Sequence, residues 1–492
     1  MTAKVPAEPA RSAIVCGGSL AGLLAARALA DHARVTVIES DVLPEGPEHR
    51  RGLPQARHVH MLWSGGAQAI EELIPGTTDA LKAHGTHYVP IPQDMVALSP
   101  RGWFPRWRES HYVLLCSRAL LDSVVRRQVL AHPRITVLER TQVLGLVGDA
   151  RAVTGVRTRT GEVEEERSAD LVVDATGRGS RATVWLKDLG LPAPLQRTID
   201  PGVVYASRVF QAPEKVRNGY PVVNVQADPR ADGPGTAGAL APIENGRWLV
   251  TLSGTRGGEP TGDPDGFMRF ALNRLRHPII GQLIANATPL SDVAITRSRS
   301  TASRRIYYER ARRWPERFVV VGDALSTYNP VYGQGMSVAA QSARALRNTI
   351  TRHGWKPGLA RRLQKAVARP AAAAWDMAAG QDIFYSGAAE QGPTFRDRVV
   401  AAYVSRLMYA STGDEKVAHA VTRVTSMEHG AYTLLAPRVV LAALRGPRLP
   451  QLGSPPLTEE ELAAAGVHKH EVEPGSPLRQ SCSLGFEAKD IR

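Results

Sequence analysis

The sequence predicts an α/β fold, in which a Rossmann-like domain is interleaved with a β-sheet domain and followed by a C-terminal helical region. Residues 12–31 combine a short apolar run, a glycine-rich turn and an Ala/Leu-rich segment, and a second apolar run follows at 34–39; this is the order strand, helix, strand. Residues 170–175 and 318–322 are apolar enough to form two more buried parallel strands. A chain of 492 residues exceeds one ordinary core, so we expect more than one domain.

The strand-like segments recur in separate pieces, which predicts a discontinuous Rossmann-like domain. Over residues 141–170, β-rich segments alternate with turn signals, as in a meander. The expected division is 1–75, 110–199 and 297–356 for the Rossmann-like domain, 76–109 and 200–296 for a substrate-binding domain, 357–446 for the helical region, and 447–492 for a largely flexible tail rich in Pro, Gly and Glu.

Composition argues against several classes of protein. The formal net charge is +14, but the basic residues are scattered and no aromatic-rich binding module accompanies them, so no nucleic-acid partner is expected. Cys16, Cys116 and Cys482 are far apart and odd in number, which indicates neither a disulfide framework nor a zinc site. Because the sequence shows no signal peptide and no apolar run of transmembrane length, we expect a cytoplasmic protein.

The segment Gly17-Gly18-Ser19-Leu20-Ala21-Gly22 is a variant of the dinucleotide-binding fingerprint, placed between a predicted strand and a predicted helix. Gly17 permits a tight turn, the small Ser19 lets the backbone approach a pyrophosphate, and Gly22 permits close helix packing. The helix N-terminus offers free N–H groups to the anion. Glu39 ends the next strand, where it can accept hydrogen bonds from the adenosine ribose; the alternative is a plain glycine turn with a solvated Glu.

A second segment, residues 322–337, places Asp323 at a strand end and then Pro330 and several glycines at the start of another helix. Asp323 can accept a hydrogen bond from a ribityl hydroxyl. The backbone near Gly333, Gly335 and Met336 can approach a flavin ring, because the helix dipole favours negative charge there. A lone Gly-Asp is usually a turn, but beside the first motif it favours a cofactor site.

Between these motifs lie three further candidates for cofactor binding. Asp174 and Gly177 follow a predicted strand, and Arg118 opens a predicted helix. A guanidinium group suits phosphate or flavin carbonyl oxygens. The alternatives are an ion pair within the helix for Arg118 and a structural turn for the Asp174 region.

Together the motifs resemble those of FAD-dependent monooxygenases of the aromatic-hydroxylase type, over roughly residues 12–350. A closer resemblance, to about residue 385, is to the polyene epoxidases of polyether ionophore biosynthesis. It is carried by Arg51-Gly-Leu-Pro-Gln55-Ala-Arg-His58-Val-His60, Leu62-Trp63-Ser64-Gly65-Gly66, Glu72-Leu-Ile-Pro-Gly76-Thr-Thr-Asp79, Cys116-Ser-Arg-Ala-Leu-Leu121 and Asn329-Pro-Val-Tyr-Gly333.

The resemblance implies a bound FAD, electrons from NAD(P)H or a separate flavin reductase, and O2 as co-substrate. A flavin hydroperoxide would deliver one oxygen atom to an alkene of a large apolar substrate such as a polyene. The resemblance also implies cofactor contacts at Arg51 and Val143, and it places Gln55 near the flavin ring. We name no catalytic acid or base, because the cofactor carries such chemistry.

Aromatic residues predict an apolar substrate pocket, with Trp63, Trp103, Tyr205 and Phe210 as candidate lining, although aromatic residues are more often plain core. His58 and His60 lack further ligand spacing, which favours a structural role over a metal site.

Three rival functions share parts of these patterns. An aromatic hydroxylase would share every cofactor motif and would need a pocket group that deprotonates a phenol. A flavin-dependent halogenase would need a W-x-W-x-I-P segment, which the sequence lacks. The third rival is non-enzymatic, either a flavin- or nucleotide-sensing protein or a membrane-surface interaction module built on the C-terminal helices. The stretch from Tyr432 to Leu444 is apolar enough to touch lipid or a partner, and packing against the main domain is the alternative.

Overall fold

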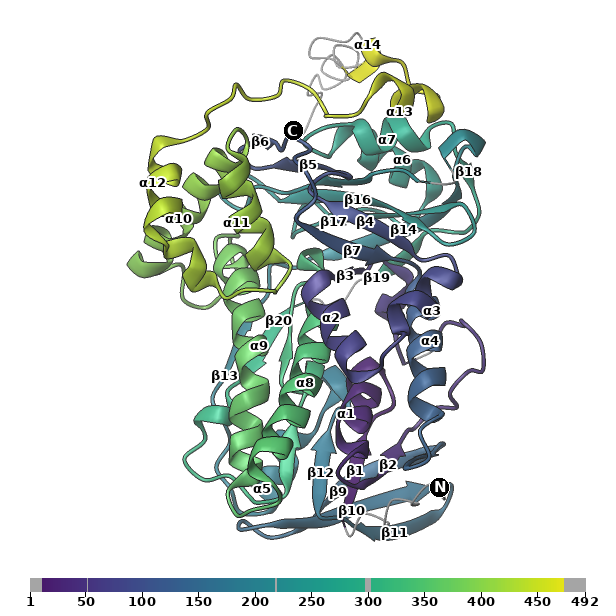
Figure 1. The fold of residues 1–492 in the computed structure, drawn as a ribbon, viewed down its shortest axis with the longest axis vertical. Coiled ribbons are helices and arrows are strands. Elements are labelled where there is room, and N and C mark those ends of the chain that lie inside the picture. The colour runs from purple at the N-terminus through teal and green to yellow at the C-terminus, as the bar shows by residue number, and fades with distance from the viewer. Residues whose placement is uncertain (1–10, 51, 217–218, 297–301, 473–492) are drawn as a thin grey trace, which may run out of the picture.

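The computed structural model describes residues 11–50, 52–216, 219–296 and 302–472. Figure 1 shows an elongated molecule, with the Rossmann-like domain at one end and a second, larger sheet at the other. Helices from the C-terminal part of the chain form a lobe beside the larger sheet. This mixed α/β architecture with a helical C-terminal region is the fold class that the sequence predicts.

A five-stranded parallel sheet forms the centre of the Rossmann-like domain. Its order is β21 (Phe318–Val320), β12 (Leu171–Asp174), β1 (Ser12–Cys16), β2 (Arg34–Ile38) and β8 (Ile135–Leu138). All four predicted strands are present, joined by β8. Cys16 pairs with Asp174, and Asp174 pairs with Val320, so the carboxyl ends of three strands lie side by side. The turns that follow these strands therefore meet at one edge of the sheet.

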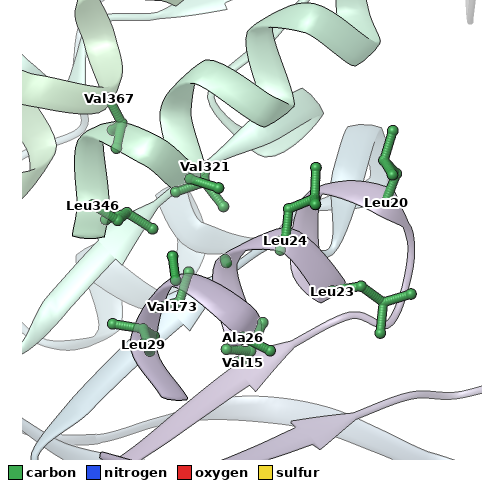
Figure 2. Packing of buried hydrophobic residues seen from close by; sticks show 14 of the residues in the cluster. Val15, Leu20, Leu23, Leu24, Ala26, Leu29, Val173, Val321, Leu346 and Val367 are labelled. Carbon is green, nitrogen blue, oxygen red and sulfur yellow. The ribbon is translucent and has the colours of Figure 1, made fainter. Parts of the chain in front are cut away.

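Helices α1 (Leu20–Ala30), α4 (Arg118–Leu130), α8 (Gly335–His353) and α9 (Leu359–Asp382) belong to this domain and share its core. Figure 2 shows Leu24 and Leu29 of α1 in the same apolar cluster as Val173 of the sheet. The cluster also takes in Leu81 of α3 (Thr77–Ala83). Residues 76–83 thus pack with the Rossmann-like domain, and not with the substrate-binding domain as expected.

The predicted meander is present as β9 (Thr141–Gly148), β10 (Val153–Thr160) and β11 (Val163–Ser168). Val153 and Val156 of β10 are buried in the first core. Helices α2 (Ser64–Leu73) and α5 (Ala182–Asp188) and a small antiparallel sheet of β13 (Gln196–Ile199), β20 (Ser303–Ile306) and β22 (Ser326–Thr327) also surround this domain. A second small antiparallel sheet, of β3 (Met61–Trp63), β7 (His111–Leu115) and β4 (His87–Ile91), packs on both domains: Leu62 and Leu114 lie in the first core, and Val113 clusters with Val222 and Ala241 of the larger sheet.

The second sheet is built from segments that interrupt the Rossmann-like domain. Its path runs β18 (Thr288–Pro289), β14 (Val204–Gln211), β17 (Arg247–Gly254), β16 (Thr236–Ile243), β15 (Val222–Val225), β5 (Met95–Ser99) and β6 (Gly102–Trp103), and β19 (Ala294–Thr296) pairs with β14. β5 pairs in parallel with β15, while the other strands on the path pair antiparallel. This pairing interleaves the two domains as predicted.

The two faces of the second sheet have different surroundings. One face carries Phe210, Trp248 and Leu252 into a second apolar core with α6 (Pro264–Asn273) and α7 (Ile279–Ile284). The opposite face carries Tyr205 and Thr251 toward a cavity above the Rossmann-like domain. Side chains alternate between faces along a strand, so each strand contributes to both.

The expected helical region, residues 357–446, is helical, but its first helix, α9, packs in the first core, and the C-terminal lobe consists of α10 (Phe395–Ser411), α11 (Glu415–Thr425) and α12 (Pro437–Arg445). The segment after it differs from expectation. Leu462 of α13 (Glu459–Ala464) and Val472 of α14 (Lys469–Val472) are buried in the second core, and Glu461 forms an ion pair with Arg106 at 2.7 Å. The expected flexible tail is therefore wrong for residues 447–472, and the rest of it lies outside the described residues.

No helix in the described part of the chain is both long enough and apolar enough to cross a membrane.

Candidate active site

The turn after β1 leaves no room for side chains. A Cβ on Gly17, whose φ is +106°, would lie 2.5 Å from the carbonyl oxygen of Ala175. A Cβ on Gly22 would lie 1.8 Å from the carbonyl oxygen of Gly17. Ser19 is the N-cap of α1, but its side chain makes no capping hydrogen bond, which leaves the N–H groups of Leu20 and Ala21 facing outward from the helix start. This turn is a cradle for an anion at a helix N-terminus.

Glu39 lies beside this cradle, where it was predicted to meet a ribose. Its Oε2 atom accepts a hydrogen bond from the Gly18 N–H at 2.8 Å and pairs with Arg50 Nη2 at 2.8 Å. Arg50 Nη1 also donates to the carbonyl oxygen of Gly18 at 3.0 Å, while its buried Nε atom has no partner among the described residues. Arg50 therefore lies across the glycine turn.

Arg50 is a functional candidate that sequence reasoning missed. The predicted cofactor contact was the neighbouring Arg51, which lies outside the described residues. The sequence signal that could have pointed to Arg50 is that it stands next to another arginine. Val143, the other contact implied by resemblance, is half-buried on β9, where it packs against the first core.

Burial on its own would raise the pKa of the Glu39 carboxyl. Hydrogen bonds from the Asp41 N–H, from Arg50 and from the Gly18 N–H more than offset burial and hold the pKa below its ordinary value. Glu39 is therefore ionised near neutral pH and can accept hydrogen bonds from a ribose.

In the turn after β12, the carboxylate of Asp174 forms hydrogen bonds within the turn itself. Asp174 is fully buried, and it accepts hydrogen bonds from the N–H and hydroxyl of Thr176 at 2.9 and 2.6 Å and from Ser180 Oγ at 2.5 Å. The side chain therefore shapes its own turn, which is the alternative that the sequence left open for this region, while the predicted cofactor contact at Asp174 stays a prediction. Gly177, with φ +75°, begins the short 3-10 helix that follows.

Asp323 shows the opposite behaviour. It follows β21, it is exposed, and it makes no hydrogen bond or ion pair with any described residue. Loss of hydration among the surrounding turns nevertheless raises the pKa of its carboxyl, while the guanidinium groups of Arg118, Arg178 and Arg304 act to lower it. An unpartnered carboxylate facing an open space near three arginines suits a ligand with hydroxyl and phosphate groups.

Arg118 forms the ion pair within its helix that was the alternative to a cofactor contact. Its Nε atom donates to Asp122 Oδ1 at 2.8 Å, so the ion pair within α4 is present. Since the same guanidinium influences Asp323, Arg118 still borders the candidate cofactor space.

The loop before α8 brings the second motif to the first. A Cβ on Gly322 would lie 2.7 Å from Cβ of Ala21, so the two motifs touch. Gly333 has φ +64°, and a Cβ on Gly335 would meet nothing within 4 Å. Pro330 and Gly335 are exposed. The side chain of Met336 is buried in the first core, so only its backbone can face a cofactor.

A cavity lies between this loop and the second sheet. Its described lining includes His58, Met61, Trp63, Tyr205, Asn224, Ala239, Thr251, Ser253, Pro330, Val331, Tyr332 and Gly333. Trp63 and Tyr205 therefore line it, as predicted. Trp103 and Phe210 do not, because they point into the second core, where their rings pack against His277 and Phe267. For these two residues the alternative of plain core is correct.

The histidines have internal partners. His58 bonds through Nδ1 to Ser207 Oγ at 2.8 Å and through Nε2 to Thr296 Oγ1 at 2.7 Å, and His60 Nδ1 bonds to the carbonyl oxygen of His58. Burial, helped by the charge of Arg57, lowers the pKa of His58 to about 4, so its ring is neutral near pH 7. Among the described residues, no group of His, Cys, Asp and Glu is placed to hold a metal ion.

These features fit FAD. The glycine cradle and the N-terminus of α1 suit the pyrophosphate, Glu39 the adenosine ribose, Asp323 the ribityl chain, and the loop at Gly333–Met336 the flavin ring. The sequence profile of the FAD binding domain family matches residues 11–380, about three-quarters of the chain. The chain belongs to this family of FAD-dependent monooxygenases.

Two curated relatives match most of the chain. Protein Rv3254 of Mycobacterium tuberculosis is 33% identical over 412 residues, which cover 80% of this chain and 84% of the relative. The 6-methylpretetramide 4-monooxygenase of Streptomyces rimosus is 26% identical over 382 residues, which cover 74% of this chain and 81% of the relative.

Solved structures support the fold alone. The p-nitrophenol 4-monooxygenase PnpA of Pseudomonas putida matches with a TM-score of 0.56 and 16% identity, covering 86% of this chain and 100% of that one. A triple mutant of the flavin-dependent brominase Bmp2 matches with a TM-score of 0.58 and 16% identity, covering 85% of this chain and 98% of that one.

Proposed function

We propose that this flavoenzyme uses O2 to epoxidise alkenes of a large, apolar, polyketide-type substrate such as a polyene. NAD(P)H or a separate flavin reductase would supply the electrons. The observation that carries the proposal is the wall of the cavity between the second sheet and the Gly333 loop. Its described lining residues include no Asp, Glu, Lys or Arg.

An uncharged wall selects an uncharged substrate. A carboxylate or ammonium group that entered this cavity would lose its hydration without gaining a counter-ion, which is strongly unfavourable. Two polar residues on the wall are already engaged: Thr251 Oγ1 bonds to Ser207 Oγ at 2.6 Å and accepts from the Val59 N–H at 2.8 Å, and both ring nitrogens of His58 are hydrogen-bonded. An apolar chain is the ligand that leaves these bonds intact.

One buried donor on the wall remains available for a polar group of the substrate. Trp63 is 7% exposed, and its Nε1 atom has no partner among the described residues. It lies 3.4 Å from the position that a Cβ on Gly333 would occupy. A carbonyl or ether oxygen beside the reacting double bond could accept this N–H.

When bound, FAD would supply the activation of O2. The protein then has to hold the alkene near the Gly333 loop and exclude water. The cavity wall provides no ionised base, because His58 is neutral near pH 7 and burial raises the pKa of the Tyr205 hydroxyl well above its ordinary value. Oxygen transfer to an alkene requires no such base.

Aromatic hydroxylation is the second candidate, and one contact favours it. Tyr332 lines the cavity and its hydroxyl donates to Asp382 Oδ1 at 2.8 Å, so an acceptor for a phenolic proton lies one residue behind the wall. The relative named 6-methylpretetramide 4-monooxygenase also favours this alternative.

The two candidates are distinguished by offering the reduced holoenzyme a linear polyene and, separately, a phenolic polyketide, in ¹⁸O2. Epoxidation predicts a polyene product that carries ¹⁸O and opens to a diol in acid. Hydroxylation predicts that only the phenolic compound gains ¹⁸O. Protein carrying Gly17→Val, which cannot form the cofactor turn, is the matched control for both reactions.

A further inference from the structure

A buried carboxylate outside the motifs ties down the loop that faces the flavin space. Asp382, at the C-terminal end of α9, is 0% exposed. Its two oxygen atoms accept hydrogen bonds from Asn329 Nδ2 at 3.1 and 3.0 Å, and Oδ1 also accepts from the Tyr332 hydroxyl at 2.8 Å. One side chain thus holds both ends of the short turn formed by Pro330–Tyr332.

The second sheet holds the same turn from the other side. The Tyr205 hydroxyl donates to Asn329 Oδ1 at 2.5 Å and accepts from the Val331 N–H at 2.9 Å. The Asn329 N–H donates to Ser303 Oγ at 2.9 Å. The loop is therefore clamped between β14 and α9, and every polar atom of the Asn329 side chain is used.

The chemistry of the clamp requires an acceptor at position 382. Asn329 Nδ2 and the Tyr332 hydroxyl are both donors, and an ionised carboxylate accepts from both at once. A protonated carboxyl or an amide would turn one of its own donors toward them. Each of those forms loses contacts that the ionised form makes.

The surroundings of Asp382 are neutral. Burial raises the pKa of its carboxyl to about 6, although the hydrogen bonds from Asn329 and Tyr332 act to lower it. The titratable groups that interact with it electrostatically are the hydroxyls of Tyr205 and Tyr332 and that of Tyr385, just beyond α9. No described lysine or arginine contributes to its pKa.

We propose that Asp382 is a positioning residue for the cofactor: in its ionised form it holds residues 329–333 in the shape that receives the flavin ring. FAD then binds the ionised form more tightly, so affinity falls as the pH drops through the pKa of Asp382. The inference rests on FAD binding by the family and not on the epoxidation proposal. If Asp382 proved not to affect FAD binding, the epoxidation proposal would be unaffected.

The experiment is the FAD dissociation constant from about pH 5 to pH 8, measured by quenching of flavin fluorescence in refolded apoprotein. For the wild-type chain we expect FAD to bind about tenfold more weakly at the acid end, the effect of one hydrogen bond to a charged acceptor. Asp382→Asn should show the weak value at every pH. Asp376→Asn is the matched control, since Asp376 lies on the same helix but is exposed and has no hydrogen bond to a described residue.

A second variant keeps the test decisive if Asp382→Asn does not fold. Tyr332→Phe removes one donor to Asp382, so it should weaken FAD binding and move the midpoint of the pH profile upward. Equal dissociation constants and equal pH profiles for the wild type and Asp382→Asn would overturn the proposal. So would a loss of affinity in the variant beside a flat wild-type profile, because that outcome marks a purely structural role.

Discussion

At the scale of single residues, the glycine turn after β1 shows how a few atoms admit or exclude a cofactor. Gly17 has a φ that L side chains rarely adopt, and Gly22 lies against the carbonyl oxygen of Gly17. These constraints could be predicted from the sequence, because the fingerprint assigns each glycine a task. The partner of Glu39 could not be predicted in the same way, since Arg50 approaches from a separate loop.

The first prediction concerns Gly22. Gly22→Ala would place a methyl carbon 1.8 Å from a backbone oxygen, so the turn must open and FAD retention should fall at least about tenfold, the effect of about 1.4 kcal/mol. The measurement is the flavin-to-protein absorbance ratio after gel filtration. Gly392→Ala, where an added Cβ meets nothing within 4 Å, should keep full colour. A yellow Gly22→Ala protein would contradict the assignment of this turn.

The second prediction concerns the ion pair of Glu39 with Arg50, whose side chains are each 7% exposed. Glu39→Gln should lower the free energy of unfolding near pH 7 by about 2 kcal/mol, the contribution of a hydrogen bond to a charged group. The pKa of Glu39 is lowered in the folded chain, so its stabilisation is present above the ordinary value of 4.5 and is lost as the pH falls through the folded value. Urea unfolding near pH 7 and again below the folded pKa of Glu39 should therefore show that the difference in unfolding free energy between the wild type and the variant is smaller at the acid pH. A difference that grows in acid would be inconsistent with this pairing.

Two of the predicted pocket residues, Tyr205 and Phe210, lie on one strand, and the alternation of side chains along that strand separates them. Tyr205 and Phe210 lie on β14 an odd number of positions apart, so they point to opposite faces and cannot both line one cavity. Strand periodicity alone could have separated them. Which face is the pocket could not be predicted, because that depends on α6 and α7 covering the face of Phe210.

At the scale of elements, the strands and helices of the Rossmann-like domain were predictable because each carries its own apolar pattern. The segment after Pro447 was not, since its composition resembles that of a mobile linker. The contacts that fix it are specific and distant: Glu461 binds Arg106 through both oxygen atoms at 2.7 Å. Local composition carries no information about such a partner.

The third prediction tests that packed segment. Leu462 is 3% exposed in the second core, so Leu462→Ala should lower the free energy of unfolding by about 2–3 kcal/mol. Leu449, 52% exposed in the same segment, provides the control, and its replacement by Ala should have almost no effect. Thermal unfolding followed by circular dichroism measures both. Equal melting temperatures for the two variants would mean that α13 is not docked.

The fourth prediction belongs to α9. The pKa of Asp382 is raised to about 6 from an ordinary 3.8, so the folded chain binds this proton more tightly than the unfolded chain. The ionised group therefore costs stability, up to about 3 kcal/mol, and the cost develops as the pH rises from about 4 to about 6. Without FAD, Asp382→Asn should remove that decline and unfold at higher urea concentration near pH 7. A variant less stable than the wild type near pH 7 would show that the hydrogen bonds outweigh the cost of burying the charge.

At the scale of the whole molecule, the cofactor space is assembled from three distant parts of the chain. The turns after β1, β12 and β21 meet because these strands are neighbours with aligned carboxyl ends. Residues 329–333 then join this edge to the second sheet through Tyr205 and to α9 through Asp382. The motifs predicted the first meeting place, but the second depends on pairs far apart in sequence that have no local pattern.

This arrangement places the cavity at the junction of the two domains, between residues 330–333 and an uncharged face of the second sheet. We propose that oxygen activated there is transferred to an apolar substrate.

The most direct test is a single turnover of the reduced, FAD-loaded chain with ¹⁸O2 and a linear polyene, in which product mass and hydrogen peroxide are measured together. We predict a product that carries one ¹⁸O atom for each flavin reoxidised, with little peroxide. Reoxidation that yields peroxide alone, with the polyene unchanged, would contradict the account.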